Sequence, residues 1–174
     1  HMLRNYLGDD AFFEGIAQYL QENKFKAAEF HQLRLAFEEV SGQDLNWFFN
    51  QWYLQSGHPV LDVKQAFNPE KKIVTIELEQ SQDLKQFPLF KLPVDVAVFD
   101  GSGKHVHRIV MTEKSQSFEL PVTGDLKCVL FDNQQMLLAK IRETKPQEQY
   151  VFQYYNGERF GAREKGLSSG FKSG

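Results

Sequence analysis

The sequence is poor in cysteine. Cys128 is the only one in 174 residues, so no disulfide can form within the chain. It lies in the largely apolar run 126–131, where a thiol is expected to be buried as a small hydrophobic side chain. A cysteine-poor chain is compatible with the cytosol and with the periplasm or secretion, so the compartment stays open.

Long hydrophobic runs and an excess of one charge are also missing. No apolar run approaches the ~18 residues of a membrane helix, and no signal peptide opens the chain. His1 and Met2 resemble a cloning remnant, so the natural start is expected to be missing. The net charge is −3, and the one basic cluster, residues 104–108, alternates between the faces of a predicted strand. We therefore expect neither a nucleic-acid partner nor a membrane.

Motifs for nucleophilic catalysis or phosphate binding are absent as well. No Gly-x-Ser-x-Gly elbow or phosphate-cradling glycine loop occurs. His105 and His107 share one face of a predicted strand, but they lack an evident third metal ligand, so a solvated strand face is the expected reading. Glu38 and Glu39 are neighbours on a predicted helix and point about 100° apart, which does not suit an acid–base pair. We expect no catalytic, cofactor-binding or metal-binding residue in this chain.

The composition that is present, 41% hydrophobic and 25% charged, is that of an ordinary folded protein. Helical periodicity predicts a first helix opened by Asp9 or Asp10, a second ended by Ser41 and Gly42, and a third capped by Asp44. The expected buried faces of these helices are Phe12, Phe13, Ile16, Tyr19 and Leu20, then Phe30, Leu33, Phe37 and Val40, then Leu45, Phe48, Phe49 and Trp52. Three such helices bury little against one another, so we expect them to need a partner surface.

From Val60 onward the period changes to two, which indicates about seven antiparallel strands in a sandwich. Early strands are predicted around Leu61, Val74 and Val94, and later ones at residues 105–111, 117–122, 126–131 and 136–141. A short helix follows near Tyr150. The remaining tail, with Gly161 and Gly166 and its Ser- and Gly-rich end, is expected to fray. The fold class is therefore α+β.

The stretch 44–61 joins the two regions. A short aromatic helix runs into Gly57, His58 and Pro59, and a strand follows. Trp47 and Tyr53 lie off the buried stripe of that helix and are possible surface contacts for a sugar or a peptide. His58 is expected to be a turn residue, hydrogen-bonded to local backbone, although a substrate or domain contact is the alternative.

This stretch resembles the end of the catalytic domain in aminopeptidase N-like zinc metallopeptidases, where a W-x(4)-G-[HY]-P-x-[LV] signature leads into a small β-sandwich. Residues 8–13 and 39–52 resemble the same family, and 159–167 resemble the opening of its terminal helical domain. The resemblance implies three parts: the helical end of a thermolysin-like catalytic domain at 1–57, a β-sandwich at 58–144 and the start of a C-terminal helical domain at 145–174. The junction residues it implies are structural: Asp44, Phe48, Trp52, Gly57, His58 and Pro59.

The family's zinc helix, H-E-x-x-H, is absent, because no two histidines stand four residues apart. The resemblance therefore implies a non-catalytic spacer and scaffold, inactive alone. Its parent uses zinc and peptide substrates, and its partners are the upstream catalytic domain and the downstream helical domain of the same polypeptide. The alternative is a free-standing β-sandwich module that binds protein or carbohydrate, with its helical face buried within the chain.

Overall fold

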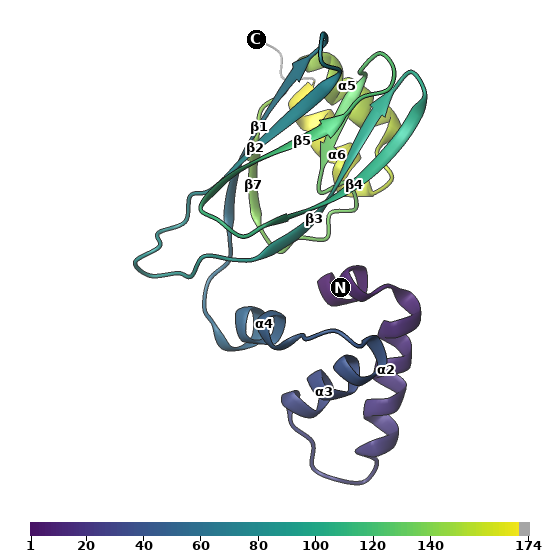
Figure 1. Ribbon diagram of the computed structural model, residues 1–174, viewed down its shortest axis with the longest axis vertical. Coiled ribbons are helices and arrows are strands. Elements are labelled where there is room, and N and C mark those ends of the chain that lie inside the picture. The colour runs from purple at the N-terminus through teal and green to yellow at the C-terminus, as the bar shows by residue number, and fades with distance from the viewer. Residues whose placement is uncertain (171–174) are drawn as a thin grey trace. The chain divides into compact units, whose positions relative to one another are not determined.

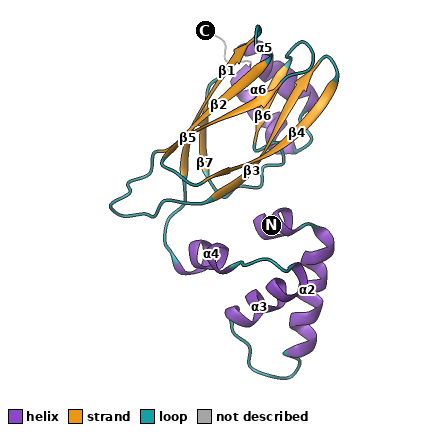
Figure 2. Ribbon diagram, in the orientation of Figure 1, coloured by secondary structure: helices purple, strands orange, loops and turns teal. Residues whose placement is uncertain are grey.

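The computed structural model describes residues 1–170 and divides them into two compact units, which meet in the sequence at Gly57 and His58. The first unit is helical, and the second contains all the strands and the last two helices (Figures 1 and 2). The predicted α+β class, with helices, a seven-stranded sandwich and a C-terminal helical segment, is confirmed.

The first unit has four α-helices and a π-helical turn. They are α1 (Met2–Leu7), α2 (Asp9–Glu22), α3 (Phe30–Ser41), α4 (Asn46–Phe49) and the π-helix η1 (Asn50–Leu54). As predicted, α3 ends at Gly42, whose φ of 66° is the left-handed conformation that glycine adopts easily. The predicted cap of α2 is wrong: Gly8 is its N-cap, and Asp9 accepts two hydrogen bonds from Arg4, at 2.8 and 2.7 Å.

An aromatic core holds the first unit together. Leu3, Phe37, Leu45, Phe48 and Phe49 are buried in it. The predicted face of α2 is too wide, because Phe13 and Leu20 are exposed while Phe12 and Ile16 pack against the core. α2 and α3 approach closely at Gly15, where an added Cβ would lie 2.5 Å from the Phe37 ring.

The second unit is a sandwich of a four-stranded and a three-stranded sheet. The larger has the order β5 (Ser115–Pro121), β2 (Ile73–Gln80), β1 (Val60–Asn68) and β7 (Lys140–Glu143); the smaller has β4 (Gly103–Met111), β3 (Leu92–Asp100) and β6 (Cys128–Phe131). All pairs are antiparallel except β1 with β7, which is parallel. Alternate residues, such as Leu61 and Val63 on β1 or Val94 and Val96 on β3, form the core.

The last two helices, α5 (Gln147–Asn156) and α6 (Phe160–Gly170), belong to this unit. Phe152 of α5 packs against Phe99, Ala97 and Cys128. The three-stranded sheet is therefore covered on both faces near β3. The expectation of no packed element in the tail is wrong for residues 160–170, because glycine lets α6 pack directly on the α5 backbone. An added Cβ at Gly166 would lie 2.6 Å from the Tyr154 nitrogen. Residues 171–174, the rest of the predicted frayed tail, lie outside the described part of the chain.

One predicted strand is displaced. Residues 136–139 form a loop, and β7 begins only at Lys140. The Asp132 carboxylate accepts hydrogen bonds from the Met136 and Leu137 amides, at 2.8 and 3.1 Å. These amides are therefore not free for a strand ladder, which explains why apolar alternation misplaced the strand.

Candidate functional site

The end of the first unit is fixed by two carboxylates. Asp44 accepts the Asn46 amide at 2.8 Å, which opens α4 two residues after it. Glu38 accepts the Leu45 amide at 2.8 Å and pairs with Arg34 at 2.6 Å. Glu39 instead accepts a hydrogen bond from Gln18 at 2.7 Å. Glu38 and Glu39 thus serve different contacts, which does not suit acid–base catalysis.

The aromatic helix has a buried side and one exposed ring. Phe48 is buried, and Trp52 is half-buried with its ring 6.4 Å from that of Phe48. The π-helical turn presents Tyr53, which stacks on Phe49 at 5.0 Å and on Phe30 at 6.1 Å. Tyr53 stays open on its outer side, as predicted.

Trp47 does not act as a free surface ring. It is half-buried and meets Tyr6 of α1 edge-on at 5.5 Å. The periodicity predicts no helix before Asp9, so α1 and this contact were not predicted. Tyr53 is therefore the better surface contact of the two.

Gly57, His58 and Pro59 lead into the sandwich. Gly57 has φ of 91°, a value that a residue with a side chain rarely adopts. His58 is exposed, and Pro59 is buried with its carbonyl accepting the Lys140 amide at 3.0 Å. The backbone conformation at Gly57 and the burial of Pro59 therefore explain why these two residue types suit the junction. Asp44, Phe48 and Trp52 belong to the first unit, and His58 and Pro59 to the second.

The two histidines of β4 differ: His105 keeps 40% of its side chain exposed, whereas His107 is turned inward, so the expectation of a solvated face is wrong for His107 only. Ile109 and Met111, on the same side, are buried, whereas Val106 and Val110 are exposed on the other side. His107 Nε2 is buried, with no hydrogen-bond partner within residues 1–170. Within the same residues, no group of three or more His, Cys, Asp or Glu side chains is placed to hold a metal ion.

The Asp100 carboxylate accepts several hydrogen bonds. It accepts the Ser102 amide and hydroxyl at 2.8 and 2.6 Å, and the Thr123 and Gly124 amides at 2.8 and 3.1 Å. These bonds, that of the Ser102 hydroxyl first, hold the pKa of Asp100 well below its usual range. The carboxylate therefore ties the β3–β4 turn to the segment after β5.

The same cluster contains a serine, a histidine and an aspartate. Ser102 Oγ lies 2.8 Å from His105 Nε2, but it also donates to Asp100 at 2.6 Å. In a hydrolytic triad the aspartate instead orients the histidine, which takes the serine proton. The arrangement here is that of a turn, and it does not activate a nucleophile.

A buried ion network joins β7 to α6. Glu143 and Lys145 are almost fully buried and lie 3.3 Å apart, and Lys165 of α6 reaches Glu143 at 2.8 Å. Lys145 also donates to the Val129 carbonyl at 3.1 Å. Both buried charges are thus paired, as stability requires.

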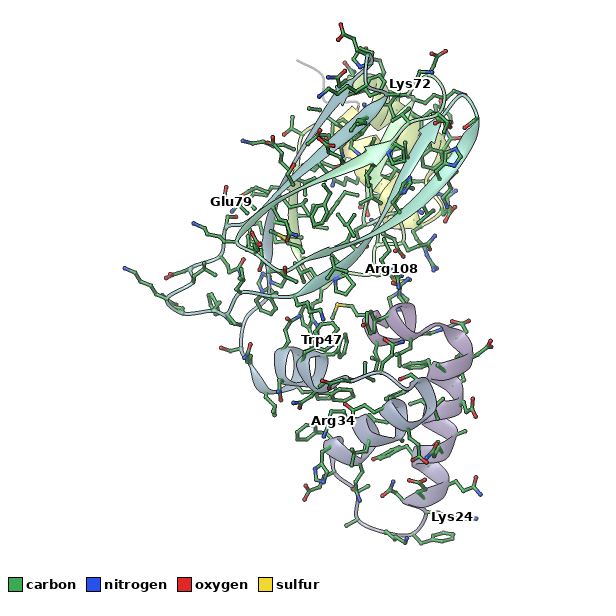
Figure 3. All side chains as sticks on the ribbon, viewed as in Figure 1. Lys24, Arg34, Trp47, Lys72, Glu79 and Arg108 are labelled. Carbon is green, nitrogen blue, oxygen red and sulfur yellow. The ribbon has the colours of Figure 1, made fainter. Side chains whose placement is uncertain are left out.

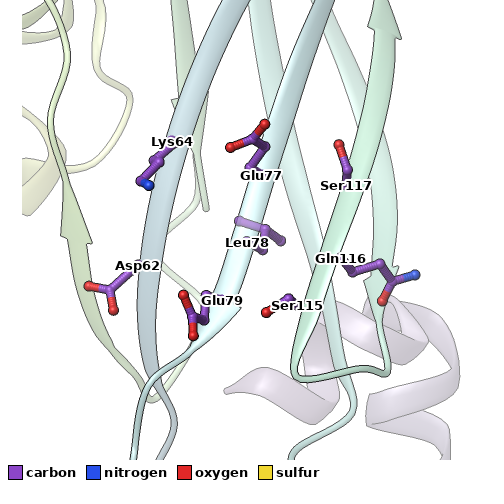
Figure 4. Close-up of a pocket in the computed structure, with 8 residues that line it drawn as sticks. All are labelled: Asp62, Lys64, Glu77, Leu78, Glu79, Ser115, Gln116 and Ser117. Atoms are coloured by element: carbon purple, nitrogen blue, oxygen red, sulfur yellow. The ribbon is translucent and has the colours of Figure 1, made fainter.

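The outer face of β1, β2 and β5 has an open hollow of about 320 Å³, lined mostly by polar residues (Figure 4). Asp62 lies opposite Glu79 and Lys64 lies opposite Glu77, two register positions apart on the same face of the sheet. Arg142 and Lys114 flank these rows, 3.6 Å from Asp62 and 3.9 Å from Glu79. The hollow can contact a polar ligand, but its lining side chains have no arrangement for covalent chemistry.

Comparison with known proteins gives two adjacent matches. Residues 1–52 match the peptidase family M1 domain, and residues 56–148 match the TAF2 Ig-like domain. The chain is 30% identical over 124 residues to the alanine/arginine aminopeptidase of Saccharomyces cerevisiae, covering 68% of the chain and 14% of that protein. It is 30% identical over 107 residues to aminopeptidase N of Escherichia coli, covering 59% of the chain and 12% of that protein.

A solved structure shares the fold. The crystal structure of Legionella pneumophila aminopeptidase A in complex with aspartic acid matches 95% of the chain and 19% of its own, with a TM-score of 0.78 and 15% sequence identity. The chain thus spans less than a fifth of the length of these relatives.

Residues that match the M1 domain are thus followed directly in the sequence by residues that match an Ig-like domain. The chain belongs to the M1 peptidase family. It is aminopeptidase N-like, and it comprises the C-terminal end of the M1 domain and the Ig-like domain that follows. None of the helices within residues 1–170 is long and apolar enough to cross a membrane.

Proposed function

We propose that this chain is the non-catalytic C-terminal part of a zinc-dependent aminopeptidase that removes N-terminal residues from peptides. One observation carries the proposal: the end of an M1 domain and an Ig-like domain follow each other in one chain, at residues 1–52 and 56–148. Relatives that are 30% identical to parts of this chain are named as aminopeptidases.

Zinc chemistry does not fit the residues present. His105 bonds to Ser102, His107 lies on an inward-facing strand side, and no group of three ligands occurs in residues 1–170. A catalytic zinc needs three protein ligands around one open position. The proposal therefore assigns the zinc, the general base and the recognition of the substrate amine to the upstream catalytic domain.

The role proposed for this chain is that of a spacer and scaffold for the catalytic cleft, with the three parts 1–57, 58–144 and 145–174. Buried polar ties support a rigid spacer: the Asp100 cluster and the Glu143–Lys145 pair fix turns and a strand of the sandwich. On α5 and α6, Tyr155 and Phe160 are exposed, which suits a downstream helical domain as a further partner.

The first test is to read the parent gene upstream of Leu3 for H-E-x-x-H, followed by a glutamate about a helix further on. The full-length protein is then assayed for release of the amine from aminoacyl 4-nitroanilides. We expect hydrolysis by the full-length protein that a chelator removes and zinc restores, and none by the 174-residue chain. A full-length protein without the motif, or with activity that survives chelation, would contradict the proposal.

The open hollow on β1, β2 and β5 favours a second candidate, a free-standing sandwich module that binds protein or carbohydrate. That reading expects the helical face to be covered within the chain. The expected face is covered in large part: Phe37 and Phe48 are buried, Phe12, Ile16 and Trp52 are half-buried, and Phe30 is exposed. Light scattering with a hydrophobic dye discriminates the two: a dye-negative monomer favours the module, and dye binding or dimerisation favours the excised enzyme part.

A further inference from the structure

The loop between α2 and α3 presents a phenylalanine to solvent. Phe25 is 96% exposed, more than any other large hydrophobic side chain in residues 1–170. Its φ of 60° lies in the left-handed region, which is unfavourable for a bulky residue. Lys24 and Lys26 flank it, with Lys24 Nζ 5.1 Å from the ring centroid (Figure 3 labels Lys24).

The loop is ordered without help from Phe25. Asn23 caps the end of α2, its side-chain amide donating to the Tyr19 carbonyl at 2.8 Å. The Lys26 amide then donates to the Asn23 carbonyl at 3.1 Å and closes a turn around Phe25. These bonds fix the backbone that carries Phe25, and a preorganised turn lowers the entropy cost of binding.

Exposure and an unfavourable φ are both costs, and no contact of Phe25 with the core of the helical unit offsets them. Strained backbone that persists at one position is a reason to look for function there. An exposed aromatic ring at a preorganised turn has the properties of an interface anchor, since aromatic side chains dominate binding energy when they fill a pocket.

We propose that Phe25 is an anchor that inserts into an apolar pocket, rimmed by carboxylates, on the preceding part of the M1 domain in the same polypeptide. This inference rests on the proposed function, which supplies that part. The M1 match is confined to residues 1–52, and the chain spans 14% of the yeast relative. The proposed partner surface therefore belongs to the same domain. Because Lys24 and Lys26 flank Phe25, acidic groups around the pocket would complement their charge.

Charge argues against a membrane surface as the partner. Glu22 and Glu29 lie on either side of the loop, so residues 22–29 carry two negative and two positive charges. An anionic bilayer acts over a distance of about one Debye length, ~8 Å, and therefore responds to the sum of these charges. A pocket rim, in contrast, contacts the two lysines individually.

The test places the photo-crosslinking residue p-benzoylphenylalanine at position 25 of the full-length polypeptide. Mass spectrometry of the monomer after irradiation is expected to find the crosslink in the segment upstream of Leu3. The 174-residue chain with the same substitution, at the same concentration, is the control, and it should give no such product. Crosslinks confined to a second copy, or to added vesicles of phosphatidylserine and phosphatidylcholine, would overturn the proposal.

A second measurement does not depend on the crosslinker. In the full-length protein, Phe25→Ala should raise the rate of protease cleavage in residues 23–29 at least tenfold, because the loop loses its anchor. Phe67→Ala, an exposed phenylalanine on β1, is the matched control and should leave this rate unchanged. Equal rates for wild type and Phe25→Ala would refute the anchor.

Failure of this inference and failure of the proposed function are distinguishable. If the protein forms the upstream crosslink but hydrolyses no aminoacyl substrate, the anchor is supported and the proposed aminopeptidase function is refuted. A zinc-dependent aminopeptidase without the crosslink retains the enzyme and refutes the anchor.

Discussion

The first unit, residues 1–57, is here called the helical unit, and the second, from residue 58 onward, the sandwich unit. The two units cover their apolar side chains to different extents. Among the described residues, the helical unit has six buried hydrophobic side chains and seven large exposed ones, whereas the sandwich unit has twenty-one buried and nine exposed. The exposed set of the helical unit is Phe13, Leu20, Phe25, Phe30, Leu35, Tyr53 and Leu54. A stable domain seldom exposes so much apolar surface relative to its core.

The sandwich unit also has more buried polar residues than the helical unit. Of the buried polar residues, only Gln51 lies in the helical unit, and the sandwich unit holds the others, among them Gln80, Asp100 and Lys145. A buried polar group stabilises a fold only where its partners are fixed. Among the described residues, the sandwich unit thus fixes more of its structure through buried polar groups than the helical unit does.

The largest expected effect tests the core of the helical unit. Phe37→Ala removes a ring that is 1% exposed and that stacks on Phe12 at 5.3 Å. The cavity should lower the free energy of unfolding by about 3–5 kcal/mol, enough to melt a small unit. Trp47 and Trp52, the only two tryptophans, lie in this unit, so their fluorescence in a urea titration reports on it alone.

Phe13→Ala, at an exposed phenylalanine of α2, is the control and should change stability far less. The sandwich is followed separately by amide hydrogen exchange in β3 and should keep its protection. Loss of protection in β3 together with the tryptophan signal would break the comparison, because the two units would then unfold as one.

The second prediction tests the polar ties of the sandwich. Gln80 is fully buried at the end of β2; its side chain donates to the Phe90 carbonyl at 2.7 Å and accepts the Phe90 amide at 2.9 Å. Gln80→Ala removes both of these buried hydrogen bonds and should cost about 1–3 kcal/mol. Urea unfolding followed by amide exchange in β2 measures this cost.

Gln86→Ala, at an exposed glutamine of the loop that Gln80 holds, is the matched control and should be close to neutral. If both variants unfold at the wild-type urea concentration, the sandwich does not depend on its buried polar ties, and this part of the comparison is wrong.

Much of the fold could be predicted because it follows local rules. The strand period around Val74 and Val94, the end of α3 at Gly42 and the burial of Cys128 all follow from neighbouring residues. At the junction, Gly57 and Pro59 could be recognised from their backbone chemistry alone.

Other features depend on partners that are distant in the sequence. His107 points inward because it lies on the same face of β4 as the buried Ile109. Periodicity alone cannot decide which of the two faces of a strand is covered. The ties of Asp100 reach Thr123, and α6 packs through Gly166 on a helix that precedes it. The exposure of Phe25 was missed as well, although Lys on both sides of an aromatic residue in a turn is a signal that sequence reading can use.

The smallest expected effect tests how tightly the sandwich covers its core at high pH. Burial raises the pKa of the Cys128 thiol to about 11, an effect that nearby Lys145 reduces only in part. The ordinary value in an unfolded chain is about 8.5. The folded state therefore binds the thiol proton more tightly, so this contribution to stability is complete below about pH 8.5 and is lost as the pH rises toward the folded pKa.

Between pH 8 and 9.5 the sandwich should accordingly lose about 1 kcal/mol of stability through this group. Cys128→Ala removes the group and should flatten that part of the pH profile, whatever constant offset the smaller side chain adds. Urea unfolding of both proteins at the two pH values, followed by amide exchange in β3 and β6, gives the difference in slope. Parallel profiles would mean that the Cys128 thiolate reaches solvent in the folded sandwich. The sandwich core would then be less closed than the comparison with the helical unit requires.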